Sequence, residues 1–145
     1  MIAIWSVYWN KDRMDLSFVP VAINSLSQLY YIAFVLPPRT KETNLTHWNA
    51  KTFGGIGIMD FVHNASGAFF TNVPPNTLTY ALTPVVAGGI LASSDWVLGS
   101  CVSYCLGALA LGQAASSAPK SWPLLLGGLS VGGGLISYLK YQPLK

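Results

Sequence analysis

The feature that most constrains this chain is a succession of glycine-rich apolar runs in its second half. Residues 79–93, 97–115 and 122–139 contain no ionised side chain and are laced with glycine and other small residues. In water such runs form poor helices, because glycine costs about 1 kcal/mol relative to alanine in a helix interior. In a bilayer, small residues let the backbones of two helices approach closely. The pattern therefore predicts membrane helices that pack backbone against backbone.

Charged residues are too few for an ordinary soluble domain. They make up 9% of the 145 residues, against about 25% in soluble domains, while 52% of the chain is apolar. They gather in short segments that flank the apolar runs, at 11–15, 39–51, 120 and 140–145. Flanking lysines are typical of membrane helices, and no basic stripe with interleaved aromatic residues indicates nucleic-acid binding. A length of 145 residues fits a single membrane domain spanning 1–145.

Five apolar stretches are candidate membrane spans, at 16–36, 52–70, 78–92, 97–115 and 122–139. An aromatic N-terminal segment, 1–15, is expected at the membrane interface, and residues 37–51 are expected to form a polar loop. The additional apolar C-terminal segment at 122–139 either crosses a hydrocarbon core of roughly 30 Å or lies along its surface. The predicted fold class is all-α, an integral membrane bundle of four to five transmembrane helices packed through faces of glycine and other small residues.

Small residues recur at four-residue spacing, which places them on one face of a helix. Gly99, Ser103 and Gly107 form the clearest such face. The full set of expected helix-packing residues is Gly88, Gly89, Gly99, Ser103, Gly107, Gly128 and Gly132. Cys101 and Cys105 are interpreted as small packing residues, since neither a metal-ligand spacing nor a disulfide framework is present.

Asp60 and His63 are the ionisable residues that lie well inside an expected span. An intramembrane Asp–His pair is a candidate proton relay. We prefer an internal polar contact that includes Asp60, His63 and Asn64, because no other expected span carries an acidic or basic residue to extend a proton path. Asn24 and Gln28, one turn apart, are expected to face a neighbouring helix. No catalytic residue, metal or cofactor is expected, since no nucleophile has a plausible base.

Three short motifs resemble the second half of the mitochondrial inner-membrane translocase family. They are Gly-Gly-Ile-Leu-Ala-Ser-Ser at 88–94, Gly-Ser at 99–100 and Leu-Gly-Ala-Leu-Ala-Leu at 106–111, preceded by a Pro-Pro-Asn loop at 74–76. The resemblance covers roughly residues 52–113. The chain departs from the family pattern in four ways: Val73 replaces an acidic residue, Ser94 stands where arginine is usual, the spacing from Asn76 to Gly88 is longer, and a fifth apolar run is added.

The family includes protein-import subunits and a four-helix accessory subunit of respiratory complex I that transports nothing. The missing arginine and acidic residue weigh against import, so the chain is closest in character to the accessory subunit. The resemblance therefore implies a multi-pass protein of the mitochondrial inner membrane and a non-catalytic role in the respiratory chain. The expected partners are lipids, with structural phospholipids among them, and other membrane subunits of a large hetero-oligomeric complex. Two alternatives stay open: a subunit of an inner-membrane protein translocase, and a small proton-coupled transporter.

Overall fold

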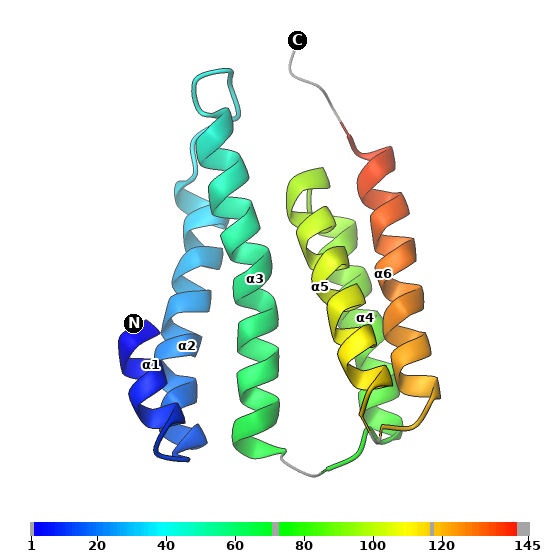
Figure 1. The fold of residues 1–145 in the computed structure, drawn as a ribbon. Coiled ribbons are helices and arrows are strands. Elements are labelled where there is room, and N and C mark those ends of the chain that lie inside the picture. Colours follow the sequence, from blue (N-terminus) through cyan, green and yellow to red (C-terminus); the bar gives the residue numbers. More distant parts are fainter. Residues whose placement is uncertain (1, 71–72, 117, 142–145) are drawn as a thin grey trace. The chain divides into compact units, whose positions relative to one another are not determined.

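The computed structural model describes residues 2–70, 73–116 and 118–141, and every regular element in these ranges is a helix (Figure 1). The prediction of an all-α fold is therefore confirmed. The sequence suggested a single domain, whereas the contacts between helices gather into two compact units, Met1–Val73 and Pro74–Lys145. Each unit has its own packing.

The N-terminal unit consists of α1 (Ile2–Trp9), α2 (Met14–Tyr30) and α3 (Asn44–Phe69). A π-helical turn, η1 (Tyr31–Val35), extends α2 and closes with a hydrogen bond of 2.8 Å from Leu36 N to Tyr31 O. The helix stops there because a proline disfavours helical geometry in the residue before it, and two prolines follow Leu36. Helices α2 and α3 lie side by side, and α1 packs on α2 (Figure 1).

Helix α3 begins at Asn44, so the expected polar loop at 37–51 is wrong in its second half. The turn before the helix is closed locally: Thr40 N donates to Thr43 Oγ1 at 2.8 Å, and Thr43 N donates back to Thr40 Oγ1 at 3.2 Å. The buried His47 ring then contacts Pro37 O at 2.6 Å, which ties the first turn of α3 to the end of η1. These contacts favour the helix where local composition alone does not.

The C-terminal unit consists of α4 (Thr77–Ser93), α5 (Trp96–Ala114) and α6 (Ser121–Leu139). Side chains begin the first two helices: Asn76 Oδ1 accepts from Thr79 N at 3.0 Å, and Asp95 Oδ1 accepts from Leu98 N at 3.1 Å. Helix α5 packs chiefly on α6, and α4 also contacts α6. The buried apolar residues of this unit are Ala87, Leu91, Val97, Val102, Leu106 and Leu126.

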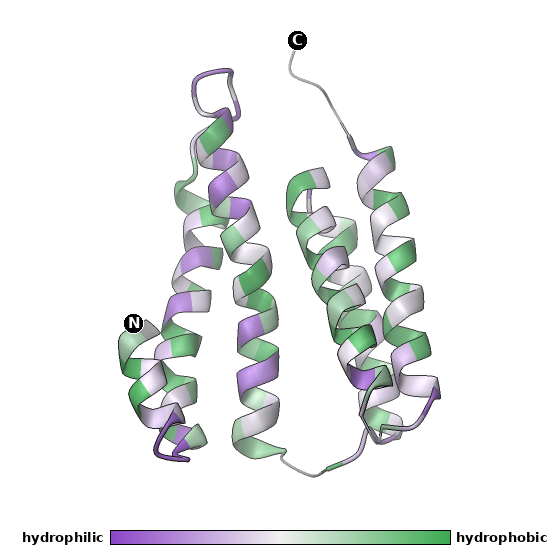
Figure 2. Ribbon diagram, viewed as in Figure 1, coloured by the Kyte–Doolittle hydropathy of each residue, from purple (hydrophilic) through white to green (hydrophobic). Residues whose placement is uncertain are grey.

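Three helical segments are long and apolar enough to cross a membrane: Met14–Val35, Trp96–Ala114 and Ser121–Leu139. They are compatible with a multi-pass membrane protein, although the count of four to five spans is not confirmed. Helix α4 is apolar but has only 17 residues, and α3 carries several polar residues in its second half. Figure 2 shows the same contrast, since strongly hydrophilic residues occur midway along α2 and α3 but only toward the ends of α4–α6.

Candidate functional site

A seam of small residues joins α5 to α6 and is the closest helix contact in the C-terminal unit. Along it, a glycine of one helix repeatedly lies opposite a serine of the other. A Cβ atom added to Gly107 would lie 2.8 Å from Ser130 Oγ, which is closer than side chains pack. We call these residues the α5–α6 seam; its opposed pairs are Gly99 with Ser137, Ser103 with Gly133, and Gly107 with Ser130.

The serine hydroxyls of the α5–α6 seam all have hydrogen-bond acceptors. Ser130 Oγ donates across the seam to Ser103 O at 2.7 Å. Ser103 Oγ and Ser137 Oγ donate to carbonyls four residues earlier in their own helices, Gly99 O at 2.7 Å and Gly133 O at 2.8 Å. A buried hydroxyl in a membrane helix must be satisfied in this way because no water is available. The hydroxyls therefore fill the space over the glycines and serve packing.

Four of the glycines expected to pack have open space over them within the C-terminal unit. A Cβ atom added to Gly88, Gly89, Gly128 or Gly132 would meet no described atom of another helix of that unit within 4 Å. These four glycines therefore lie outside the α5–α6 seam, and their packing against another helix stays a prediction. The reason is the helical turn of about 100° per residue: Gly133 lies in the seam, whereas Gly132, one residue earlier, lies outside it.

A second close approach, between α2 and α3, depends on two glycines of α3. Gly54 lies directly against Ile32, and a Cβ atom on Gly57 would lie 2.7 Å from Gln28 Oε1. Both glycines belong to the run Gly54–Gly57. The helical spacing predicts Gly57 on a protein-facing stripe with Asp60, Asn64 and Gly67, and it assigns no face to Gly54. The structure shows that both glycines meet α2 and its extension η1.

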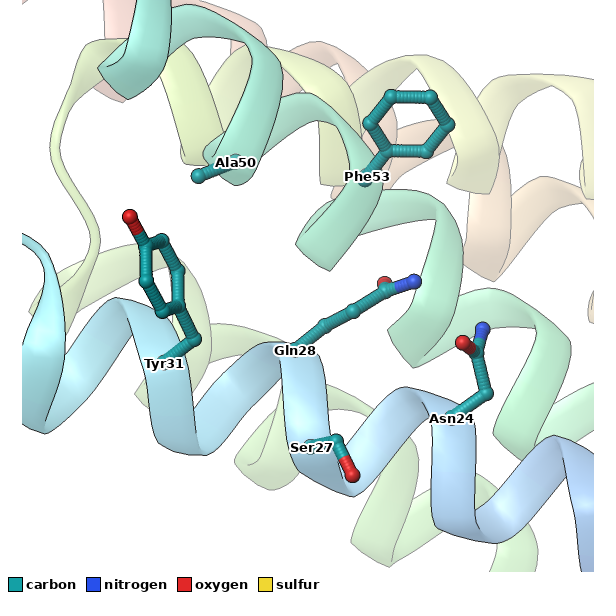
Figure 3. Close-up of a pocket in the computed structure, with 6 residues that line it drawn as sticks. All are labelled: Asn24, Ser27, Gln28, Tyr31, Ala50 and Phe53. Carbon is teal, nitrogen blue, oxygen red and sulfur yellow. The ribbon is translucent and has the colours of Figure 1, made fainter.

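A groove of about 220 Å³ opens beside this contact. It is lined by Asn24, Ser27, Gln28, Tyr31, Ala50 and Phe53. Figure 3 shows Gln28 extending from α2 toward α3, with Asn24 and Tyr31 one turn away on either side. Asn24 and Gln28 thus face a neighbouring helix, as their one-turn spacing predicted. The oxygens Gln28 Oε1 and Ser25 Oγ are buried without a hydrogen-bond partner among the described atoms, so the region can accept a proton donor such as water.

Asn64 is the one member of the expected polar contact that lies inside the unit. It is only 7% exposed, and its Oδ1 accepts a hydrogen bond of 2.8 Å from Trp5 Nε1 of α1. Its Nδ2 donates to the backbone oxygen of Asp60 at 2.8 Å. The side chains of Asp60 and His63 are exposed, so of the three residues expected to form an internal polar contact only Asn64 is buried within this unit. Asn64 faces α1, while Asp60 and His63 lie on the outer side of the same helix.

Substituting Trp5 by phenylalanine tests whether this buried hydrogen bond holds α1 in place. Trp5→Phe keeps an aromatic ring but leaves Asn64 Oδ1 without its donor, and such a buried acceptor costs about 1–3 kcal/mol. We expect a clear fall in the Tm followed by circular dichroism in detergent. Trp9→Phe is the matched control, because Trp9 stacks on Trp5 at 5.3 Å and lacks the bond to Asn64. An equal loss in both variants would show that ring packing alone stabilises α1.

Lys140, which follows α6, links the end of that helix to the end of α4. Its ammonium group donates to three backbone carbonyls at the end of α4, Leu91 O at 2.9 Å, Ala92 O at 2.7 Å and Ser94 O at 2.8 Å. The last carbonyls of a helix have no partner within the helix and carry partial negative charge, so a cation is favoured there. From the sequence alone Lys140 is a flanking lysine, because its acceptors lie more than 40 residues away in the chain.

The described residues include no group of three or more His, Cys, Asp or Glu side chains that could hold a metal ion. Cys101 and Cys105 are thiols on α5 that form no disulfide, and both are half-buried. The α2–α3 groove has Tyr31 as its one titratable lining residue.

Comparison with protein-family models, with curated proteins and with solved structures gave no match to this chain. The function of this chain is therefore inferred from the geometry of each unit and from its apolar helices.

Proposed function

We propose that this chain is a non-catalytic structural subunit of a larger membrane assembly. The motif resemblance suggests the particular setting, an accessory subunit of respiratory complex I in the mitochondrial inner membrane. The observation that carries the proposal is the set of glycines over which no other helix of their own unit packs, among the residues described: Gly88, Gly89, Gly128 and Gly132. A membrane helix gains from such glycines chiefly when another helix lies over them.

The outer face of α6 shows this most clearly. Gly128 and Gly132 lie there among three large apolar side chains, Leu124, Val131 and Leu135, which are 75%, 67% and 61% exposed. Ridges of leucine and valine around a glycine hollow match the surface into which a side chain of a second helix packs. Lipid tails cover leucine equally well, but they gain nothing from the missing side chains. The face is therefore better suited to another subunit than to lipid alone.

Native electrophoresis of the gently solubilised, tagged chain tests the proposal. We expect it to migrate in a high-mass band that also stains for NADH dehydrogenase activity in the gel. A high-mass band without that activity would refute complex I as the parent and retain the structural role. Migration at the mass of the chain alone, in a detergent that preserves respiratory complexes, would refute the structural role itself.

A substitution on the outer face of α6 tests whether migration in the high-mass band depends on the glycines of that face. Gly128→Leu fills the hollow, so we expect most of the chain to leave the high-mass band while its own Tm stays unchanged. Gly128→Ala is the graded control, because one methyl group fills far less of the hollow and is expected to lose less. Full assembly of Gly128→Leu would show that this face contacts no other subunit.

The groove between α2 and α3 favours one alternative, a subunit of a protein translocase. That hypothesis required a water-accessible groove lined by Asn24, Gln28, Asp60 and Asn64. The structure brings only Asn24 and Gln28 into one groove, because Asn64 bonds to Trp5 and Asp60 lies on the outer side of α3. The transporter alternative depends on Asp60 and His63, whose side chains are exposed on the outer side of α3.

Thiol labelling distinguishes a water-accessible groove from a groove that a neighbouring subunit covers. In a background with both native cysteines replaced by alanine, a translocase groove predicts rapid reaction of Ser27→Cys with a membrane-impermeant maleimide. Leu26→Cys is the matched control, since Leu26 neighbours Ser27 and is 56% exposed outside the groove lining. For a structural subunit we expect both thiols to react slowly. Rapid and selective reaction of Ser27→Cys would shift the assignment to the translocase.

A further inference from the structure

A mixed face runs along the outer side of α3, away from α2. Ile56, Asp60, His63 and Gly67 follow one another at spacings of three or four residues, which places them on one face of the helix. The first three are exposed, and a Cβ atom on Gly67 would meet no described atom within 4 Å. We call these four residues the outer α3 face. It is partly apolar, narrow at Gly67, and carries a carboxylate at its centre.

The carboxylate of Asp60 lies level with the middle of α2. On one side of it in sequence, Gly57 lies against Ser25, with 3.5 Å between a Cβ added at Gly57 and Ser25 Cα. On the other side, the rings of Phe61 and Phe18 are 5.3 Å apart. Asp60 is therefore at the depth of residues 18–25, which is the interior of the apolar segment Met14–Val35. If α2 crosses the membrane, Asp60 lies inside the hydrocarbon layer, nearer to the end at which α2 begins.

Apart from His63, which is close enough to act electrostatically on the carboxylate, no described residue offers Asp60 a cation at that depth. Helices α4, α5 and α6 contain no Asp, Glu, Lys, Arg or His. In the N-terminal unit, Lys11 and Arg13 precede α2, Arg39 and Lys41 follow η1, and Lys51 lies nine residues before Asp60, or about 13 Å along the helix. The titratable group beside Asp60 is His63, one turn away. Helices α4, α5 and α6 of a second copy would bring no cation either.

An exposed carboxylate at the centre of a bilayer is costly, by about 2.5–3.5 kcal/mol on insertion scales. Such groups persist where they face protein and have a partner. We propose that the outer α3 face docks a membrane helix of another subunit, and that this helix brings a lysine or arginine to the Asp60 carboxylate. Ile56 supplies apolar contact beside the ion pair, and Gly67 lets the two backbones approach. The inference rests on the proposed structural role and names the chemistry of the partner.

Site-specific photo-crosslinking in native membranes tests the identity of the partner. With benzoylphenylalanine in place of Ile56, we expect a crosslink to a membrane helix of a different subunit that has Lys or Arg within about two turns of the attached residue. Val62, which is 49% exposed on the opposite side of α3, is the control and should not reach that helix. Crosslinks to lipid alone, to this chain or a second copy, or to a helix without a cation would overturn the proposal.

Charge substitution tests the ion pair itself. Because Asp60 is exposed, Asp60→Asn leaves α2–α3 packing intact, and we expect it to lower the Ile56 crosslink about tenfold, the factor that 1.4 kcal/mol represents. Asp60→Lys should abolish the crosslink, and replacing the partner's cation with glutamate should restore it. An unchanged crosslink in both Asp60 variants would overturn the ion pair. If the crosslink is unchanged but the chain still migrates in the high-mass band, the ion pair is refuted and the structural role is retained. If the chain is also missing from that band, the ion pair and the structural role are both refuted.

Discussion

Replacing Gly133 by leucine is expected to separate α6 from α5, while the same change at Gly132 leaves the two helices packed. Gly133 is buried, and a Cβ atom there would lie 2.7 and 3.0 Å from the two methyl groups of Leu91 as well as 2.5 Å from Ser103 Oγ. The whole leucine side chain has no space among these groups. Overpacking of a tight core costs about 1–3 kcal/mol, and the need to move a backbone puts Gly133→Leu at the upper end.

The two cysteines of the chain report this separation directly, because both lie half-buried on α5. A thermal scan with a maleimide that fluoresces on reaction should show α5 thiols exposed at a Tm roughly 10 °C lower in Gly133→Leu. Gly132→Leu should scan like the unmodified chain, since its Cβ position is open. Equal scans for the two variants would mean that the α5–α6 seam does not hold the helices together.

The contrast between these neighbouring glycines shows what the sequence predicts and what it leaves open. On α5 the small residues repeat every four positions with larger residues between them, so periodicity singles out Gly99, Ser103 and Gly107. On α6, glycines occupy 127, 128, 132, 133 and 134 and so point to several sides of the helix. No periodicity distinguishes the seam glycine from the open ones there. Only the position of the neighbouring helix does so.

The polar residues of α3 also show that sequence periodicity does not predict which residues of one helix face are buried. Gly57, Asp60, Asn64 and Gly67 span about 80° of the helix, so the sequence placed them together on one protein-facing stripe. In the structure the border between buried and exposed runs along that stripe: Gly57 and Asn64 face inward, and Asp60 faces outward. The position of the border depends on α1, whose Trp5 bonds to Asn64 from 59 residues away. Local patterns carry no information about such a contact.

The two units bury different kinds of side chain, so different substitutions are expected to destabilise each unit most. The buried residues of α2 and α3 are small or polar, such as Ser17, Ser25, Gly57 and Asn64. The C-terminal unit buries leucine and valine, including Leu126 at 1% exposure. Loss of a hydrogen bond or of a glycine should therefore dominate in the first unit. In the second, the α5–α6 seam and the Lys140 contacts should have the largest effects.

Lys140→Met is expected to release the end of α4 from α6. The substitution keeps much of the apolar length of the side chain and removes three hydrogen bonds from a charged donor, each of 2.7–2.9 Å. Hydrogen bonds to charged groups contribute about 1.5–3 kcal/mol. Because Lys140 is half-exposed and water can replace part of the loss, we expect a net cost near 2 kcal/mol. Lys120→Met is the matched control, since Lys120 is exposed at the other end of α6 and the change in net charge is identical.

Hydrogen exchange of the amides in residues 88–96, read by mass spectrometry, measures the release where it occurs. In Lys140→Met these amides should exchange faster because the last turn of α4 loses its anchor, whereas Lys120→Met should match the unmodified chain. Lys140→Arg distinguishes charge from geometry: a planar guanidinium spreads its donors and is less able than an ammonium group to reach three convergent carbonyls. Intermediate exchange in Lys140→Arg is therefore expected. Protection equal to that of lysine would show that positive charge at the end of α4 is sufficient, and that the three-fold contact adds nothing.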